Sequence, residues 1–319
     1  MKAIRIHEFG GTENLQVDEI DKPVPSADEV LIKVSASGIN FADTMLRQNK
    51  YLFSPTLPFV LGFEVAGTVE SIGENVKNIQ AGQRVLATIR GGGYAEYAAA
   101  NARTVVPIPD NLGFSEATAL LVQGLTALGL ITDLKSGQAI LIHAAAGGVG
   151  SLLVQLAKLK GARVIGTASS AAKLQKVVDL GADFGINYTE EDWPTQVLQA
   201  TDGAGADLII EMVGGEIGRR NFECLAIKGT MEVYGAASGE DFKISALSLL
   251  GKMQTVKGYN LNLETPENMM KFTGELMGYI ASDKLKIEVT EFSLEEAAKA
   301  HEEIEGRKTT GKVVLTANN

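Results

Sequence analysis

Short apolar runs alternate with amphipathic stretches through the middle of the chain. The runs cover residues 139–143, 163–167, 184–187, 207–212, 229–234 and 254–257. Buried strands joined by helical crossovers produce such a pattern, so it predicts a parallel sheet. The helix expected after Gly148 carries apolar residues at helical spacing, namely Val149, Leu152, Leu153, Leu156 and Leu159. We expect this stripe to lie on the sheet.

The two ends of the chain are patterned differently. Six of the eight prolines precede residue 110, and the runs 29–34 and 65–69 lie among proline and glycine turns. They predict short strands in a small, mainly β domain. Thr265 and Pro266 predict a helix start, Ser293 begins a capping box, and residues 312–315 predict a final strand.

These patterns together predict an α/β chain of two domains. We expect a Rossmann domain, a doubly wound parallel sheet, over residues 123–263. The segment 264–319 is expected to return to the first domain, which would then comprise residues 1–122 and 264–319.

Composition narrows the chemistry. The chain has 319 residues, and its 45% of hydrophobic residues is ample for a core. Cys224 is the single cysteine, which excludes an internal disulfide and a four-cysteine zinc site. A histidine-based metal site would have to use His7, His143 and His301. Of the last two, we expect His143 to be structural and His301 to pack in the core.

Charge and hydropathy bear on partners and location. The net charge of −10 argues against nucleic acid or an anionic membrane surface as the main partner. No run of about 18 apolar residues occurs, so we expect no membrane span. The N-terminus has charges and glycines where a signal peptide would have its apolar region, and we expect a cytoplasmic protein.

Residues 139–150 form the strongest local motif. An apolar run leads into a glycine-rich turn and then into the patterned helix, with Ala145, Gly147 and Gly150 at the three places of a dinucleotide fingerprint. We interpret the turn as a nucleotide site that includes Ala146, Gly148 and Val149. The alternative is a tight strand-to-helix turn without a ligand.

The end of the next strand indicates which dinucleotide is bound. NAD enzymes place an acid there for the ribose 2′-hydroxyl, but no Asp or Glu occurs between Arg163 and Val178. Ser169 and Lys173 could hold a 2′-phosphate instead. We therefore hypothesise NADPH as the cofactor. The alternative is an ordinary helix start with a solvated lysine.

The chain resembles the zinc-independent quinone oxidoreductases of the medium-chain dehydrogenase/reductase superfamily. The family signature is matched at Gly137, Gln138, Leu141, Ala145, Ala146, Gly147, Gly148, Gly150, Gln155 and Lys158. Further likeness covers residues 38–43, 61–67, 186–188 and 307–315. The resemblance implies a GroES-like catalytic domain made from both chain ends, a Rossmann domain between them, and an active site in the cleft.

The same resemblance implies roles for individual residues. Asn40 and Tyr51 would be catalytic, with Asn40 also contacting the nicotinamide. Tyr188 would pack near the adenosine phosphate, and Tyr234 and Gly235 would pass the nicotinamide ribose. Arg307 and Lys312 would reach the cofactor from the C-terminal segment. The plainer alternatives are a turn residue at Asn40, core packing for Tyr51 and Tyr234, and solvated surface charges for Arg307 and Lys312.

The resemblance also bears on metal and substrate. Zinc alcohol dehydrogenases have a cysteine where Asn40 stands, a histidine where Phe63 stands and a third ligand near Gln123, so we expect no metal. We expect a local hydrogen-bonding role for Glu64, which follows Phe63. Met45 and Gly258 replace larger polar residues of some relatives, which leaves the substrate less certain than the cofactor.

We therefore expect an NADPH-dependent enzyme that transfers a hydride to a quinone without zinc. The alternatives are reduction of the double bond of an enone or 2-alkenal, and an NADPH-binding protein with little turnover. The family also implies a homodimer that pairs through the edge strand at 254–257.

Overall fold

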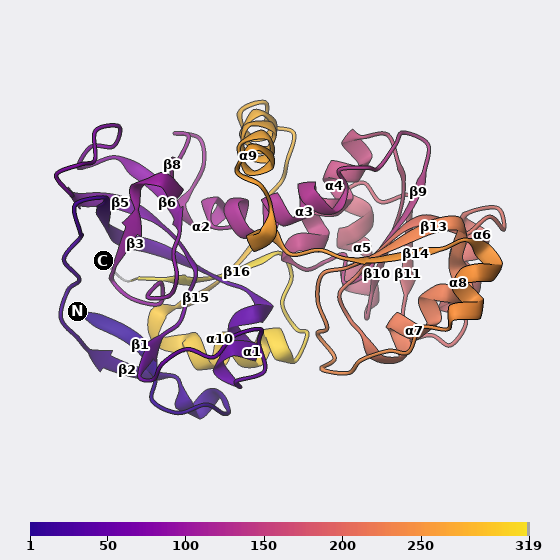
Figure 1. The fold of residues 1–319 in the computed structure, drawn as a ribbon, viewed down its shortest axis with the longest axis horizontal. Helices are drawn as coiled ribbons and strands as arrows, with labels where there is room; N and C mark the ends of the chain where they lie inside the picture. The colour runs from indigo at the N-terminus through magenta and orange to yellow at the C-terminus, as the bar shows by residue number, and fades with distance from the viewer. Residues whose placement is uncertain (318–319) are drawn as a thin grey trace. The chain divides into compact units, whose positions relative to one another are not determined.

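The computed structural model, described for residues 1–317, divides into two compact units. The first unit contains Met1–Val122 and the segment from Ile287 onward, and the second contains Gln123–Lys286. The chain thus leaves the first unit once and returns once (Figure 1). A π-helical segment, Leu120–Gly124, covers the first of these boundaries.

The first unit is mainly β. Its strands are β1 (Lys2–Ile6), β2 (Gln16–Glu19), β3 (Glu29–Ile39), β4 (Phe59–Val60), β5 (Glu64–Ile72), β6 (Arg84–Thr88), β7 (Tyr97–Asn101), β8 (Val105–Pro107), β15 (Val289–Ser293) and β16 (Lys312–Thr316). Its helices are α1 (Phe41–Arg47), α2 (Phe114–Ala117) and α10 (Ala297–Glu305). The two strands expected at 29–34 and 65–69 are confirmed as parts of β3 and β5.

Strand β3 organises this unit. It pairs antiparallel with β5, β7 and β16 within a seven-stranded sheet, so the C-terminal strand of the chain lies beside an early one. A separate sheet has the order β2-β1-β4. Valine and isoleucine side chains of β3 and β5 form one core cluster, as their β-branched shapes favour. The expected return of the C-terminal strand to the first domain is confirmed.

The second unit contains one six-stranded parallel sheet. Its strands are β9 (Ala139–Ile142), β10 (Arg163–Ala168), β11 (Phe184–Asn187), β12 (Ala206–Glu211), β13 (Leu225–Val233) and β14 (Thr255–Gly258), in the spatial order β11-β10-β9-β12-β13-β14. All six apolar runs of the sequence correspond to these strands. The order reverses between β9 and β12, as in a doubly wound fold, where ligands bind at the carboxyl ends of the strands.

Helices cover this sheet. The helices of the second unit are α3 (Leu125–Leu130), α4 (Gly148–Leu159), α5 (Ala171–Asp179), α6 (Trp193–Ala200), α7 (Gly215–Cys224), α8 (Ala246–Lys252) and α9 (Pro266–Ala281), of which α9 packs on α3. In α4 the expected stripe is buried at Leu152, Leu153 and Leu156, whereas Leu159 is 43% exposed at the helix end. Trp193 and Val197 of α6 pack in a cluster with the sheet residue Leu141.

The second boundary differs from the expected one. Residues 264–286 lie with the second unit, although the sequence suggested that they belong to the first domain. The reason is α9, which packs on α3. Its start is as expected, because the Thr265 hydroxyl caps the helix by accepting from the Asn268 amide. In the described part of the chain, no helix is long and apolar enough to cross a membrane.

Candidate active site

The glycine-rich turn joins β9 to α4 as the motif predicts. Ala145 donates its backbone N–H to the Thr167 carbonyl on β10, at 2.9 Å, which fixes the turn at the carboxyl end of the sheet. Gly147 is the residue before α4, and no side chain caps this helix start. The first N–H groups of α4 thus point out of the helix, which favours an anion there.

Two positions of the turn, Gly147 and Gly150, favour glycine for different structural reasons. A Cβ at Gly150 would lie 2.7 Å from the Cα of Ala145, so only glycine allows α4 to pack this closely on the turn. A Cβ at Gly147 would meet only the Ala144 carbonyl, at 3.2 Å. Space beside Gly147 is therefore open on its other sides, as the backbone approach of a pyrophosphate requires. The described geometry fits a dinucleotide at this turn.

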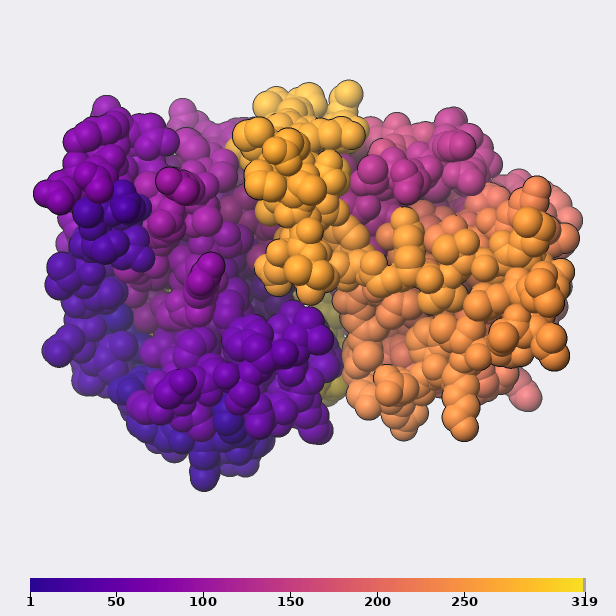
Figure 2. Space-filling view, in the orientation of Figure 1, coloured from indigo at the N-terminus to yellow at the C-terminus, as the bar shows by residue number. Residues whose placement is uncertain are grey.

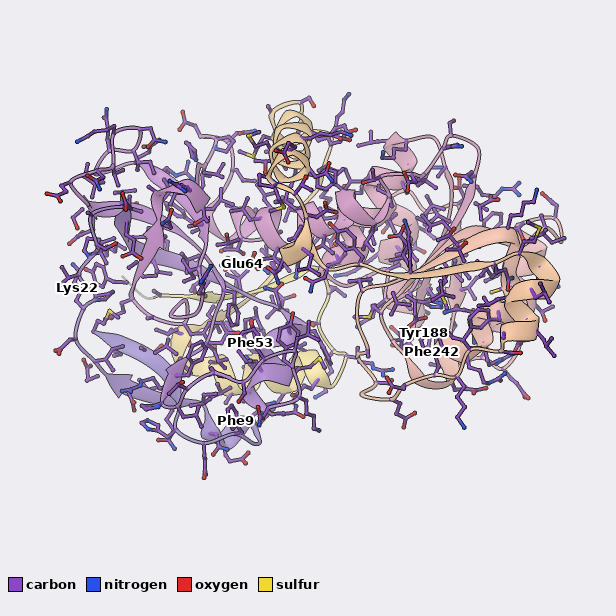
Figure 3. All side chains as sticks on the ribbon, viewed as in Figure 1. Phe9, Lys22, Phe53, Glu64, Tyr188 and Phe242 are labelled. Atoms are coloured by element: carbon purple, nitrogen blue, oxygen red, sulfur yellow. The ribbon has the colours of Figure 1, made fainter. Side chains whose placement is uncertain are left out.

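The predicted 2′-phosphate residues follow β10. Ser169 is half-buried, and its neighbour Ser170 is the N-cap of α5 and accepts from the Lys173 amide. Lys173 lies in the first turn of α5. Tyr188 joins this group because its backbone N–H donates to the Ala168 carbonyl at 3.3 Å. Figure 3 labels Tyr188 within this unit. The fold thus brings Ser169, Lys173 and Tyr188 to one end of neighbouring strands.

Tyr234 and Gly235 follow β13 on the same edge of the sheet. The Tyr234 amide donates to the Glu211 carbonyl at 3.0 Å, so this segment continues beside β12. Burial, together with the charge of Glu211, raises the pKa of the Tyr234 phenol well above its ordinary value. The phenol therefore stays neutral at physiological pH.

A buried polar network lies beneath these loops. His143 Nδ1 is 3.0 Å from the Thr167 hydroxyl, and its Nε2 is 2.7 Å from Asn221 Oδ1. Asn221 in turn donates to Glu211, whose carboxylate also accepts the Gly214 amide at 2.7 Å. His143 therefore links the ends of β9, β10 and β12 and is structural, as expected from the sequence.

Two signature residues are also explained by structure alone. The Gln155 side chain donates to the Lys286 carbonyl at 2.9 Å and accepts the Lys286 amide at 2.7 Å. Lys158 pairs with Asp183 at 2.8 Å, and Asp183 accepts the Val164 amide. Both residues therefore make structural contacts within the second unit.

In the first unit, Asn40 is the N-cap of α1. Its side chain accepts the Asp43 amide, and the Asp43 carboxylate accepts the Asn40 amide at 2.9 Å, which completes a capping box. Asn40 is half-buried at the end of β3. Asn40 can therefore be both a turn residue and a residue of the site, because capping fixes where its side-chain amide lies.

Lys312 lies beside Asn40 and is buried. Its ammonium pairs with Glu64 and donates to Asn40 Oδ1 at 3.1 Å, and Asn40 Nδ2 donates to Glu64 Oε1 at 2.9 Å. The Lys312 side chain has no exposed surface. It contacts Asn40 rather than extending into solvent, whereas Arg307, the other predicted basic residue, is exposed after α10.

A buried hydrogen-bond chain runs behind α1. The Tyr94 hydroxyl donates to Asp43 Oδ2 at 2.9 Å and is 3.1 Å from His301 Nε2. Burial is the main cause that raises the pKa of Asp43 to about 7 and lowers that of His301 to about 3. His301 is therefore neutral and packed in the core, as expected. The contact of Asp43 with Tyr94 could not be predicted, because Tyr94 lies 51 residues away.

Aromatic side chains gather near Glu64. Tyr51 and Phe53 meet edge to face with ring centroids 5.8 Å apart, and Phe53 meets Phe63 in the same way at 6.3 Å. Phe53 is 49% exposed and is labelled in Figure 3. Burial and the charge of Asp43 raise the pKa of the Tyr51 phenol, which therefore remains a hydrogen-bond donor. The group offers an apolar surface to a planar ligand.

The donor set does not fit a catalytic zinc. Zinc sites use cysteine, histidine or carboxylate ligands. By the resemblance, Asn40 and Phe63 would stand where zinc relatives have two of their ligands, with the third near Gln123, and none of these three side chains is of those types. Asn40 and Glu64 contact each other directly, and the Lys312 ammonium contacts both. Among residues 1–317, no group of three or more His, Cys, Asp or Glu side chains could hold a metal.

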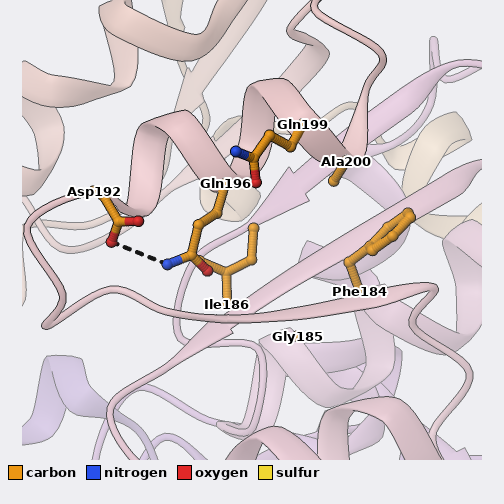
Figure 4. Close-up of a pocket in the computed structure, with 7 residues that line it drawn as sticks. All are labelled: Phe184, Gly185, Ile186, Asp192, Gln196, Gln199 and Ala200. Carbon is orange, nitrogen blue, oxygen red and sulfur yellow. Dashed lines mark hydrogen bonds between the residues drawn. The ribbon is translucent and has the colours of Figure 1, made fainter.

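A separate depression lies at the outer edge of the parallel sheet. It measures about 500 Å³ and is lined by Phe184, Gly185, Ile186, Asp192, Gln196, Gln199 and Ala200 (Figure 4). Gln196 donates to Asp192 across its rim at 3.0 Å. The glycine-rich turn follows β9, two strands away from the edge strand β11 that lines this depression.

Comparisons with known proteins agree with this geometry. A model of the alcohol dehydrogenase GroES-like domain matches residues 26–110, and a zinc-binding dehydrogenase model matches residues 148–275. A quinone oxidoreductase of Pseudomonas aeruginosa is 35% identical over 98% of this chain and 99% of its own. This chain belongs to the quinone oxidoreductase family. The family lies within the medium-chain dehydrogenase/reductase superfamily, as the sequence indicated.

Solved structures extend the comparison. A quinone oxidoreductase of Escherichia coli, solved as a complex with NADPH, is 34% identical over 99% of this chain and 100% of that one, with a TM-score of 0.93. The enoyl reductase of CurK is 26% identical over 99% of both chains, with a TM-score of 0.89. The predicted combination of a Rossmann domain and a GroES-like domain is therefore confirmed.

Proposed function

We propose that this protein is an NADPH-dependent oxidoreductase that transfers a hydride to a quinone without zinc. The full-length similarity to quinone oxidoreductases carries the proposal, together with the glycine-rich turn and the absence of an acid after β10. When bound, NADPH supplies the hydride. Its pyrophosphate would lie against the N-terminus of α4, at Ala146, Gly147, Gly148, Val149 and Gly150.

The residues of the first unit would orient the acceptor. Asn40 is held by capping and by its contacts with Glu64 and Lys312, so its amide can fix a polar ligand group in one position. The neutral Tyr51 phenol can donate to a carbonyl oxygen as negative charge develops on it. Tyr51, Phe53 and Phe63 would exclude water from a planar ring. Quinones are already electrophilic, so this arrangement does not require a Lewis acid.

Cofactor preference is tested by binding. We expect NADPH to bind more tightly than NADH, and Lys173→Ala to weaken NADPH binding about 10- to 100-fold, because a charge-assisted hydrogen bond contributes about 1.5–3 kcal/mol. NADH binding should change little. Lys176→Ala is the matched control, since Lys176 lies on the same helix one turn later. Equal affinities for the two dinucleotides would refute the cofactor proposal.

Acceptor class is tested by one panel of substrates. NADPH oxidation is measured with 1,4-benzoquinone, 9,10-phenanthrenequinone, a cyclic enone and a 2-alkenal, and the products are identified. Turnover of the quinones supports the proposal. The similarity to an enoyl reductase favours double-bond reduction as the second candidate, and saturated carbonyl products without quinone turnover would establish it. Tight NADPH binding without turnover would indicate a binding protein.

We also propose a homodimer that forms through β14. This strand is at the edge of the parallel sheet, so one side of its backbone has no strand partner in the described chain. Exposed apolar side chains precede it, with Leu247 at 78%, Leu250 at 75% and Met253 at 68% exposure. Figure 2 shows this part of the chain at the surface of its unit. A monomeric mass at micromolar concentration would refute the dimer.

A further inference from the structure

Three side chains from distant parts of the sequence meet around one amide. Antiparallel pairing sets Val313 of β16 opposite Ile39 of β3, so the preceding residue, Lys312, comes beside Asn40. Glu64 begins β5, the neighbour of β3 on its other side. The sheet register therefore brings a cation and an anion to the end of β3, where Asn40 begins α1.

The contacts give the Asn40 amide a single orientation. Its carbonyl oxygen faces the Lys312 ammonium, a donor only, and its nitrogen faces a Glu64 oxygen at 2.9 Å, an acceptor only when ionised. Rotating the amide by half a turn would set carbonyl against carboxylate and NH₂ against ammonium. Both new contacts would be repulsive, so the ion pair discriminates between the two orientations.

The backbone is adapted to hold this ion pair. A Cβ at Gly38 would lie 2.6 Å from Lys312 Cε and 2.8 Å from Glu64 Cγ, so glycine leaves the space that both side chains cross. Lys312 and Glu64 have side chains 0% and 2% exposed. A fully buried ion pair contributes little to stability by itself, because desolvation offsets the attraction. Its position against Asn40 suggests a role in the site.

We propose that Lys312 and Glu64 are positioning residues, which act together to fix the orientation of the Asn40 amide toward the ligand. This inference rests on the proposed function, in which Asn40 contacts the cofactor or acceptor. It replaces the expectation that Lys312 binds the cofactor directly. A neutral, correctly sized pair at these positions would preserve the core and the capping contact with Asp43, but it would remove the two charged contacts that favour one amide orientation.

The test is a double-mutant cycle between the ion pair and Asn40. Removing one charge alone can unfold the protein, so both are replaced together, as Glu64→Gln with Lys312→Met. We expect kcat/KM for 1,4-benzoquinone to fall about 10- to 100-fold, the scale of a misplaced contact. In an Asn40→Ala background, the same pair of replacements should change kcat/KM less than about twofold. Equal losses in both backgrounds would overturn the proposal.

An exposed ion pair of the same unit provides the matched control. Lys22 and Glu70 are 2.8 Å apart, with side chains 37% and 42% exposed, and Lys22 is labelled in Figure 3. Glu70→Gln with Lys22→Met removes the same charges. We expect it to leave kcat/KM unchanged in both backgrounds.

A readout independent of activity separates this inference from the proposed function. The side-chain NH₂ resonances of Asn40, identified by their loss in Asn40→Ala, are followed by NMR. We expect them to shift or broaden in the Glu64→Gln, Lys312→Met protein and to stay in place in the control. Unchanged Asn40 signals would overturn the positioning role even if quinones are turned over. Absence of quinone turnover in the wild type would instead refute the proposed function.

Discussion

The buried carboxyl of Asp43 predicts an unusual dependence of stability on pH. Its pKa rises from the ordinary 3.8 to about 7, mainly through burial and despite hydrogen bonds from the Asn40 amide and Tyr94. Lys312 lowers this pKa and Glu64 raises it, and both effects are smaller. Below pH 3.8 the carboxyl is protonated in both the folded and the unfolded chain, so its shifted pKa does not lower the free energy of unfolding there.

Between pH 3.8 and about 7, the Asp43 carboxyl is ionised in the unfolded chain but still protonated in the folded chain. Stability therefore falls as the pH rises from about 4 to about 7, and the full cost remains above that. The two pKa values differ by about 3, at about 1.4 kcal/mol for each unit, which gives about 4 kcal/mol. Asp43→Asn keeps the shape and the acceptor oxygen but cannot ionise, so it should avoid this loss.

The assay compares wild type and Asp43→Asn by hydrogen exchange of β3 amides at pH 4, 5.5, 7 and 8, which reports the opening of the first unit alone. We expect the difference in opening free energy to move by about 4 kcal/mol in favour of the variant between pH 4 and 8. The exposed carboxyl of Glu70 is a control, because Lys22 lowers its pKa and its effect on stability therefore depends on pH in the opposite direction. A difference that does not change with pH would refute the reasoning.

Three further substitutions or treatments test the second unit. Gly150→Ala should lower the free energy of unfolding by about 1–3 kcal/mol, because the added Cβ would overlap the turn backbone. Gly274 is an exposed helical residue with nothing near its Cβ position, so Gly274→Ala should leave the free energy of unfolding unchanged or raise it by about 0.5–1 kcal/mol. Thermal unfolding measures both effects. Cys224, buried and with its pKa raised to about 12, should resist a thiol reagent until the protein unfolds, and rapid native labelling would contradict this burial. Gln155→Ala should lower stability by about 1–3 kcal/mol, because the Lys286 backbone loses two hydrogen bonds to the Gln155 side chain; an unchanged melting temperature would contradict that role.

The sequence predicted the parallel sheet because its signals are local. The strands β9 and β12 are nearly continuous apolar runs, and the turn at Gly147 combines strand, glycines and helix within a short stretch. The capping boxes at Asn40 and Ser293 depend on residues only three apart. Ser293 was predicted, whereas the box at Asn40 was missed, although the same spacing of Asn40 and Asp43 could have revealed it.

Long-range contacts could not be predicted in this way. Lys312 and Glu64 are 248 residues apart, and only the pairing of β16 with β3 brings them together. The sequence shows only a lysine near the C-terminus, whereas the structure shows that Lys312 is a buried partner of Asn40. The boundary at 286 was missed for a similar reason, since packing of α9 on α3 leaves no local signal.

Quinone turnover measured together with zinc content tests the central claim most directly. The purified protein is assayed for NADPH oxidation by 9,10-phenanthrenequinone, and bound metal is determined in the same sample before and after a chelator. We predict turnover at substoichiometric zinc that the chelator does not change, because Asn40, Phe63 and Gln123 provide no zinc ligands. Turnover that scales with bound zinc, or no quinone turnover at saturating NADPH, would contradict the account.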